Sequence, residues 1–158
     1  MGEVIILLGS NINPAVNIRG GALSLAARLP ILNASSVWLI PAFGSSGPGF
    51  YNAAVLCNTN MNENDLKYKI LRPIEEQLGR IRTSDKYAAR TLDMDTIILN
   101  GTVIEPRLWD TAFILLPIAE IAPNFHNPIS GLTLQELANE IEPASNATRM
   151  PDFQLFLK

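Results

Sequence analysis

The stretch from residue 79 to residue 100 constrains the chain most, because a basic polar loop runs there directly into an apolar segment. Residues 91–99 alternate polar and apolar side chains before ending in Ile-Ile-Leu, a pattern typical of a β-strand. Successive side chains of a strand point to opposite faces, so Asp93 and Asp95 are predicted on one face and their apolar neighbours in the core. The fold must therefore contain a strand that carries two neighbouring carboxylates on one face.

Two carboxylates side by side repel each other unless positive charge lies between them. Magnesium prefers oxygen ligands, commonly one or two carboxylates together with substrate phosphates. Further positive charge for such phosphates is available just upstream, in Arg80, Arg82, Lys86 and Arg90. The pattern predicts a magnesium and polyphosphate site. The alternative is the solvent face of an edge strand beside an ordinary solvated loop.

Composition limits the class of protein. The chain has 158 residues, of which 47% are hydrophobic and 17% charged, so one domain over residues 1–158 with a full core is expected. A net charge of -3 argues against a nucleic-acid partner. The single Cys57 lies in an apolar run, which predicts a buried, inert thiol and fits a reducing compartment. Residues 4–8 are too few to cross a bilayer, so no membrane partner and a cytoplasmic location are expected.

The order of elements predicts the fold class. Strands are expected near 3–8, 31–40, 50–57 and 91–99, with a hairpin strand at 102–104. Helices are expected from 14 to about 29 and from about 62 to 78. Pro73 inside the second should kink it or mark an irregular turn. This order is that of an α+β sandwich with a ferredoxin-like βαββαβ core. Its mostly antiparallel sheet would carry helices on one face and loops, with the site, on the other.

The last third of the chain predicts a helical extension of that core. Residues 113–121 read as a strand end that runs into a short helix at 117–121. Residues 132–141 form an amphipathic helical pattern, which begins with a capping box between Thr133 and Glu136. The remainder is expected to pack on the body as an extended tail. His126 lies in a loop rich in Pro and Asn, where a structural or a functional role are both open.

Three positions outside the basic loop are candidates for ligand contact or for structure. Gly9 follows the first strand and permits a close approach of the backbone, but no Gly-Lys-Ser/Thr follows, so a P-loop is excluded. Phe43 is the bulky residue of a Gly/Ser/Pro-rich loop and either stacks on a flat ligand or anchors the loop. Asn52 interrupts an apolar strand and either satisfies backbone groups or recognises a ring with an amide-like edge.

Several motifs occur in a fixed order along most of residues 4–123. They are Leu-Gly-Ser-Asn at 8–11, Phe-Tyr-Asn-Ala-Ala-Val at 50–55, Ile-Glu and Leu-Gly-Arg-Ile-Arg within 74–82, Ala-Arg-Thr-Leu-Asp-Met-Asp at 89–95, and Phe-Ile-Leu-Leu-Pro-Ile-Ala-Glu-Ile-Ala-Pro at 113–123. In this order they resemble the 6-hydroxymethyl-7,8-dihydropterin pyrophosphokinases of folate biosynthesis. The resemblance implies transfer of a pyrophosphoryl group from ATP to the hydroxymethyl group of a reduced pterin.

The resemblance also implies roles for individual residues. Asp93 and Asp95 match the pair that binds two Mg²⁺ ions, and together with Arg80, Arg82 and Arg90 they form the implied catalytic set. The residues implied to contact ATP are these three arginines with Glu75, Lys86, Tyr87, Thr96 (through its backbone) and Arg107. The residues implied to line the pterin pocket are Ala42, Phe43, Gly44, Phe50, Asn52 and Phe113. Asn52 would read the amide edge of the ring, which Phe43 and Phe113 would sandwich.

The chain departs from the family pattern before Phe113. Residues 105–112 form a shorter segment without His, which leaves Arg107 as the candidate basic residue there. Tyr87 stands where Trp is common, within the loop implied to close over ATP. An active monomeric pyrophosphokinase is the first hypothesis. A pterin-binding paralogue without transfer and a transferase for another ring or phosphate donor are the alternatives, and membership of a larger folate enzyme is open.

Overall fold

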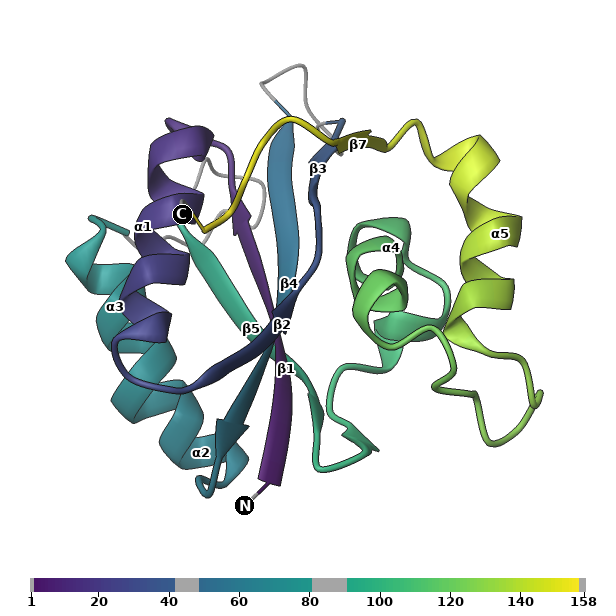
Figure 1. Ribbon diagram of the computed structural model, residues 1–158, viewed down its shortest axis with the longest axis horizontal. Helices are drawn as coiled ribbons and strands as arrows, with labels where there is room; N and C mark the ends of the chain where they lie inside the picture. The colour runs from purple at the N-terminus through teal and green to yellow at the C-terminus, as the bar shows by residue number, and fades with distance from the viewer. Residues whose placement is uncertain (1, 42–48, 81–90, 157–158) are drawn as a thin grey trace.

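The computed structural model, which describes residues 2–41, 49–80 and 91–156, contains an antiparallel sheet between two helical layers (Figure 1). Across the described part the sheet has seven strands, in the order β6-β5-β1-β4-β3-β7, with β2 paired to β4. The strands are β1 (Gly2–Ser10), β2 (Ile31–Ala34), β3 (Val37–Ile40), β4 (Phe50–Thr59), β5 (Asp93–Leu99), β6 (Thr102–Val103) and β7 (Thr148–Met150). The predicted α+β class and antiparallel sheet are confirmed.

The strand predicted at 31–40 is two strands, because the chain leaves the sheet at Ser35 and Ser36. The backbone N–H of Ser35 donates to the Ala54 carbonyl at 2.8 Å, and the Ser35 hydroxyl accepts the Ala54 N–H at 2.8 Å. A serine side chain therefore replaces one backbone partner of β4 at this point. β2 and β3 consequently pair with different parts of the same long strand.

One face of the sheet is covered by α1 (Pro14–Ala26), α2 (Glu63–Asp65), a π-helical turn (Leu66–Leu71) and α3 (Arg72–Gln77). Pro73 marks an irregular turn, one of the two outcomes predicted, because a π-helical turn directly precedes α3; α2, this turn and α3 follow one another without a break. Pro73 has no N–H for the helix, and the chain forms a wide turn before it in which the Arg72 N–H donates to the Lys67 carbonyl. Leu92 and Met94 point into the core on this face, as predicted.

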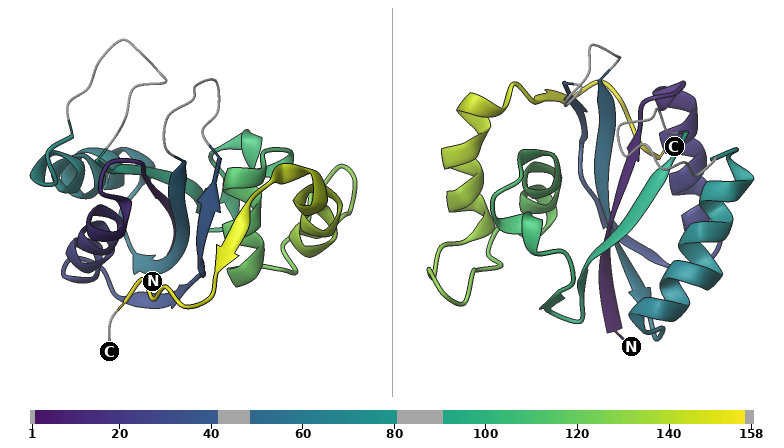
Figure 2. Two further views of the ribbon diagram at one scale, coloured as in Figure 1. Left: turned by 90° about the horizontal axis from the view of Figure 1, so that it is seen from above. Right: turned by 180° about the vertical axis from the view of Figure 1, so that it is seen from behind.

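The opposite face is covered by α4 (Ala112–Ile121) and α5 (Leu134–Ser145), which Figure 2 shows on the far side of the sheet from α1. Two predictions are wrong here. Residues 113–121 lie within one helix and contain no strand, and this face is not left to loops. The apolar α4 buries Ile114, Leu115 and Ile118 against Leu7 and Ala54 of the sheet. An apolar run of this length suits a buried helix as well as a strand.

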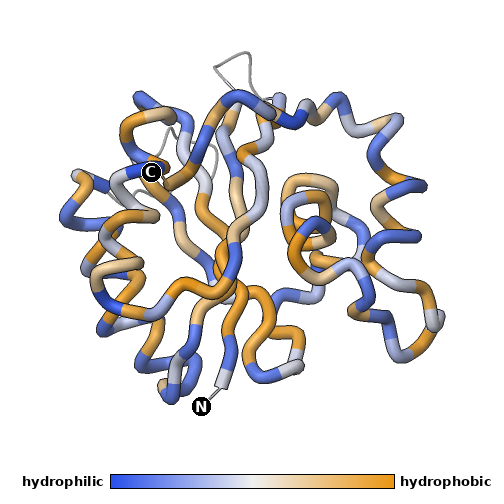
Figure 3. The backbone as a smooth tube through the Cα atoms, viewed as in Figure 1, coloured by the Kyte–Doolittle hydropathy of each residue, from blue (hydrophilic) through white to orange (hydrophobic). Residues whose placement is uncertain are grey.

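The predicted capping box of α5 is confirmed, because Thr133 and Glu136 exchange side-chain and backbone hydrogen bonds. Hydrophobic and hydrophilic residues alternate along α5, whereas hydrophobic residues are concentrated in the central strands and α4 (Figure 3). Leu134 and Ala138 are the buried residues of α5 and pack with α4. α5 is therefore the outer, half-solvated layer on this side.

The C-terminal segment packs on the body, as predicted, and first adds the edge strand β7 to β3. Leu155 is buried in the core beneath α1. The Arg19 side chain donates to the Gln154 carbonyl at 2.8 Å and lies 4.1 Å from the centre of the Phe153 ring. These contacts hold the last described residues against α1.

Two adjacent glycines of α1 differ in the space around them, which provides a matched test of helix-to-sheet packing. A Cβ at Gly21 would lie 2.7 Å from the buried Leu92 side chain, whereas one at Gly20 would lie 3.3 Å from the half-buried Leu78. We expect Gly21→Ala to lower the free energy of unfolding by about 1–3 kcal/mol through overpacking. Gly20→Ala should leave it unchanged or raise it by up to about 1 kcal/mol, because alanine favours the helix. Urea titration of both variants checks this, and equal effects would contradict it.

Candidate active site

A cleft of about 290 Å³ lies along the outer edge of β5. β6 pairs with Ile98 and Leu99, and no strand in the described part of the chain pairs with the first half of β5 on that side. The opposite wall is the helical segment that precedes the basic loop. The residues that line the cleft are Glu63, Lys67, Leu71, Arg72, Glu75, Asp93, Met94, Asp95, Thr96, Ile104 and Glu105.

Glu75 links the helical wall to the open edge of β5. Its side chain is 2% exposed, and its Oε2 accepts the Met94 N–H at 2.8 Å, a donor that a further strand would otherwise satisfy. The same oxygen accepts from Nη1 of Arg80 at 2.7 Å, and that nitrogen also donates to Oδ1 of Asp93 at 2.5 Å. One guanidinium therefore bridges a buried carboxylate and the first aspartate of the predicted pair.

The pKa values of Arg80 and Asp95 are shifted by solvent loss and by the neighbouring charges. Burial works against the charge of Arg80, but the adjacent carboxylates of Asp93 and Glu75 outweigh it and raise the pKa of the guanidinium. Loss of solvent on the side that faces the cleft raises the pKa of Asp95 to about 7, although the residue as a whole is exposed. The negative charges of Asp93 and Glu75 act in the same direction.

The donor set fits a hard divalent cation. Asp93 and Asp95 both line the cleft and supply carboxylate oxygens, as their placement on one strand face predicted. Within the described residues no three His, Cys, Asp or Glu side chains are grouped as metal ligands. A cation here would thus have two carboxylates from the described protein and further coordination positions for other oxygens, such as phosphate oxygens.

Arg107 lies on a 3₁₀ turn (Pro106–Trp109) and contacts groups on two sides. Its Nε and Nη2 donate to Oε1 of Glu105 at 2.9 and 2.7 Å, and its guanidinium lies 5.9 Å from the centre of the Phe113 ring. The hydrogen bond to Glu105 raises the pKa of Arg107, and Asp95 and Asp93 add to this effect. The basic residue predicted in the shortened segment therefore lies between the cleft and Phe113.

The predicted ring-binding residues meet beside β1. Gly9 is directly opposite Asp93 on one side and Asn52 on the other, so the carboxylate and the amide belong to one row across the sheet. Asn52 is 4% exposed, and its Nδ2 donates to the Phe113 carbonyl at 3.2 Å. A Cβ at Gly9 would lie 2.7 Å from Oδ1 of Asn52 and 3.9 Å from the Phe50 ring. Phe50, Asn52 and Phe113 are thus brought together.

Several predicted site residues lie outside the described part of the chain. They are Ala42, Phe43, Gly44, Arg82, Lys86, Tyr87 and Arg90. Conversely, sequence reasoning missed Lys67 and Arg72 on the helical wall. In the π-helical turn the Arg72 N–H donates to the Lys67 carbonyl, and both residues line the cleft. The sequence signal for this turn was Pro73, which lacks an N–H for a regular helix.

Two other candidates from the sequence are not among the residues that line the cleft. Cys57 is fully buried, and burial raises its pKa to about 12, as expected of an inert thiol. His126 pairs with Thr133 through a backbone bridge.

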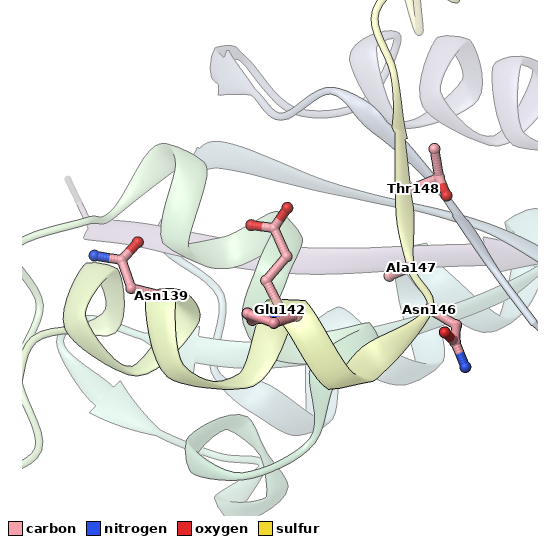
Figure 4. Close-up of a pocket in the computed structure, with 6 residues that line it drawn as sticks. Asn139, Glu142, Asn146, Ala147 and Thr148 are labelled. Carbon is pink, nitrogen blue, oxygen red and sulfur yellow. The ribbon is translucent and has the colours of Figure 1, made fainter.

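A second, open hollow of about 480 Å³ lies between the end of α5 and β7 (Figure 4) and is formed by one continuous segment, residues 139–148. No described helix has the length and apolar character needed to cross a membrane.

Comparison with known proteins adds the decisive observation. A family model for 7,8-dihydro-6-hydroxymethylpterin-pyrophosphokinase (HPPK) matches residues 5–123 of the chain. The chain belongs to the HPPK family. The site residues that the resemblance implies, from Ala42 to Phe113, lie inside the segment that matches the HPPK family.

Curated relatives carry the corresponding enzyme name. A 2-amino-4-hydroxy-6-hydroxymethyldihydropteridine pyrophosphokinase of Synechocystis sp. is 32% identical over 149 residues, which cover 87% of this chain and 75% of the relative. A protein of the same name from Methylorubrum extorquens is 31% identical over 149 residues, 87% of this chain and 92% of the relative. A folic acid synthesis protein of Dictyostelium discoideum is 30% identical over 119 residues, which cover 70% of this chain but 18% of that protein.

Solved HPPK structures share the fold. An HPPK-DHPS in complex with substrates has a TM-score of 0.73 at 11% identity, over 94% of this chain and 48% of that one. The wild-type HPPK-DHPS of Plasmodium falciparum with SDX-DHP has a TM-score of 0.69 at 14% identity, over 94% of this chain and 47% of that one. The chain thus spans about half the length of these two-part HPPK proteins.

The raised pKa of Asp95 predicts a pH-dependent stability in the absence of metal. The folded protein keeps this proton up to about pH 7, whereas the unfolded chain releases it near 3.8, so the Asp95 contribution to stability falls as pH rises between these values. We expect Asp95→Asn to be more stable than the parent by about 1 kcal/mol at pH 8, since solvent contact screens the effect. The difference should vanish at pH 4. Urea titrations with chelator at both pH values check this, and a difference that does not change with pH would contradict it.

The close approach at Gly9 predicts a variant that folds but loses the geometry of Asn52. A methyl group at position 9 would overlap Oδ1 of Asn52, which is the end of a side chain and moves at low cost. We expect Gly9→Ala to retain the fold and to weaken binding of a reduced pterin by at least about tenfold, equivalent to about 1.4 kcal/mol. Calorimetric titration with the pterin, beside a far-ultraviolet circular dichroism spectrum, measures both. Unchanged pterin affinity would contradict the expectation.

Proposed function

We propose that this chain transfers a pyrophosphoryl group from ATP to the hydroxymethyl group of 6-hydroxymethyl-7,8-dihydropterin, a step of folate biosynthesis. The single observation that carries the proposal is the row Asp93–Gly9–Asn52 across three neighbouring strands. In this row the carboxylate proposed to hold the metal and phosphates lies two strands from the amide proposed to bind the ring. HPPK membership and the names of the relatives support it. Adjacent strands are separated by about 4.8 Å, so Asp93 and Asn52 are about 10 Å apart across Gly9. This separation suits one ligand that has a ring at one end and a reacting oxygen at the other.

In the proposed reaction the hydroxymethyl oxygen forms a bond to the β-phosphorus of ATP. The bond from that phosphorus to the oxygen shared with the α-phosphate breaks, AMP leaves with the electron pair, and the hydroxyl proton passes to solvent. Asp93 and Asp95 would hold Mg²⁺, for which two ions are proposed. When bound, these would neutralise phosphate charge and orient both reactants. The protein forms no covalent intermediate in this proposal.

The remaining residues bind and orient. Arg80 holds Asp93 in place by a direct hydrogen bond and is itself bonded to Glu75. Glu75 and the backbone of Thr96 would face the nucleotide from the two walls of the cleft. Arg107 would exchange its partner Glu105, which lines the cleft, for a phosphate of the nucleotide. We assign phosphate contacts to Arg82, Lys86 and Arg90, with Tyr87 beside them. Phe50 and Phe113, with Ala42, Phe43 and Gly44, would surround the ring that Asn52 reads.

A pterin-binding protein without transfer is the second candidate. The observation that favours it is the pairing of Arg107 with Glu105 in a segment that lacks other basic residues. In that case the protein would bind a pterin in the ring pocket but would lack a basic residue of this segment to bind the ATP phosphates. A monomer in the cytoplasm is also part of the first proposal, and light scattering after gel filtration measures the oligomeric state.

Release of AMP distinguishes the two candidates. With saturating ATP, Mg²⁺ and the dihydropterin, we expect one AMP for each diphosphorylated pterin. Asp93→Asn and Asp95→Asn should each lower kcat by at least about 10³-fold, because they remove charge that the transition state requires. Asp152→Asn, an exposed carboxylate distant in sequence from the cleft residues, serves as the control and should retain activity. Pterin binding without AMP release in the parent protein would overturn the first candidate and favour the second.

A further inference from the structure

α4 contains a proline at a position where helices seldom tolerate one. Pro117 is the sixth of its ten residues and is buried against the sheet. A proline inside a helix has no N–H for the carbonyl four residues earlier, and its ring pushes that carbonyl away from the helix axis. In α4 the carbonyl concerned belongs to Phe113.

The Phe113 carbonyl has a specific partner outside the helix. Nδ2 of Asn52 donates to it at 3.2 Å from the neighbouring strand β4. The proline thus leaves an acceptor at the point where the amide of Asn52 needs one. An amide buried at this level without a partner would be costly, so the pairing satisfies both groups.

This pairing fixes the orientation of the Asn52 amide, with Nδ2 toward the Phe113 carbonyl and Oδ1 toward Gly9. Nitrogen and oxygen ends of an amide have nearly the same shape, but an oxygen directed at the Phe113 carbonyl would be repelled. With one N–H given to Phe113, the amide retains its second N–H and its Oδ1. Oδ1 lies over Gly9, where the missing Cβ leaves room. The pair that remains is complementary to a ring edge with adjacent C=O and N–H groups.

We propose that Pro117 is a positioning residue for ring recognition, which acts by freeing the Phe113 carbonyl to orient the amide of Asn52. The inference rests on the proposed function, in that the ligand read by Asn52 is the cyclic amide edge of a reduced pterin. In this proposal Pro117 acts without touching the ligand. Composition alone would assign it only to the apolar packing of α4.

The test compares helix prolines. Pro117→Ala and Pro117→Val both restore the N–H at position 117, and valine also keeps most of the buried volume. Pro143→Ala makes the same change in α5 at an exposed position and is the matched control. Pterin affinity is measured calorimetrically with a saturating non-hydrolysable ATP analogue and Mg²⁺, nucleotide affinity is measured alone, and urea titration gives stability.

We expect both Pro117 variants to raise the Kd of the reduced pterin by about tenfold and to leave the nucleotide Kd within about twofold. Pro143→Ala should change neither. A purely structural role would instead lower stability and weaken both ligands together. Unchanged pterin affinity in the valine variant, or an equal loss for the nucleotide, would overturn the inference.

Asn52→Ala separates this inference from the proposed function. If Asn52→Ala keeps the parent affinity for the pterin, the ring is not read at Asn52 and the proposed pocket fails. If Asn52→Ala loses affinity while the Pro117 variants keep it, only the positioning role fails. In the double variant Pro117→Val with Asn52→Ala, the effect of the proline should disappear, because it acts through the amide. A persistent tenfold effect would assign it to the Phe113 ring instead and overturn the inference.

Discussion

The bridge of Glu75, Arg80 and Asp93 is the interaction on which the arrangement of the cleft depends. The first half of β5 pairs with β1 on one side, but no described strand pairs with its other edge. An unpaired strand edge is a site for unwanted pairing. Glu75 occupies that edge by accepting the Met94 N–H, and Arg80 joins its carboxylate to Asp93. The edge can thus stay open as a cleft wall while its nearest backbone donor is satisfied. The same three side chains thus supply the charge beside the proposed metal site and cover part of the open strand edge.

The carboxylate pair and its orientation could be predicted from the sequence, because strand alternation depends only on backbone geometry. Leu92 and Met94 are buried and the two aspartates line the cleft, as that rule requires. The capping box of α5 was predictable for a similar reason, since Thr133 and Glu136 contact each other within one turn. Local rules succeed where both partners lie close in the chain.

The placement of α4 was not predictable by the same rules. Its sequence is apolar on all sides, so no period distinguishes a buried helix from a strand, and Pro117 argues against either. The contacts that decide the matter lie far away in the chain. Asn52 donates to Phe113, while Glu120 accepts the indole N–H of Trp38 at 2.6 Å and the Ser36 hydroxyl at 2.9 Å. These hydrogen bonds hold α4 against β4 and residues 36–38 across an otherwise apolar interface, beside the proposed ring pocket.

The surroundings of Trp38 have a consequence for spectroscopy. This indole is 1% exposed, donates to the Glu120 carboxylate, and has the Arg149 guanidinium 5.1 Å from its ring. It is directly opposite Asn52 in the sheet. Indole emission responds to nearby charge, so the native fluorescence of this residue would report small displacements of α4 during ligand binding without any attached label.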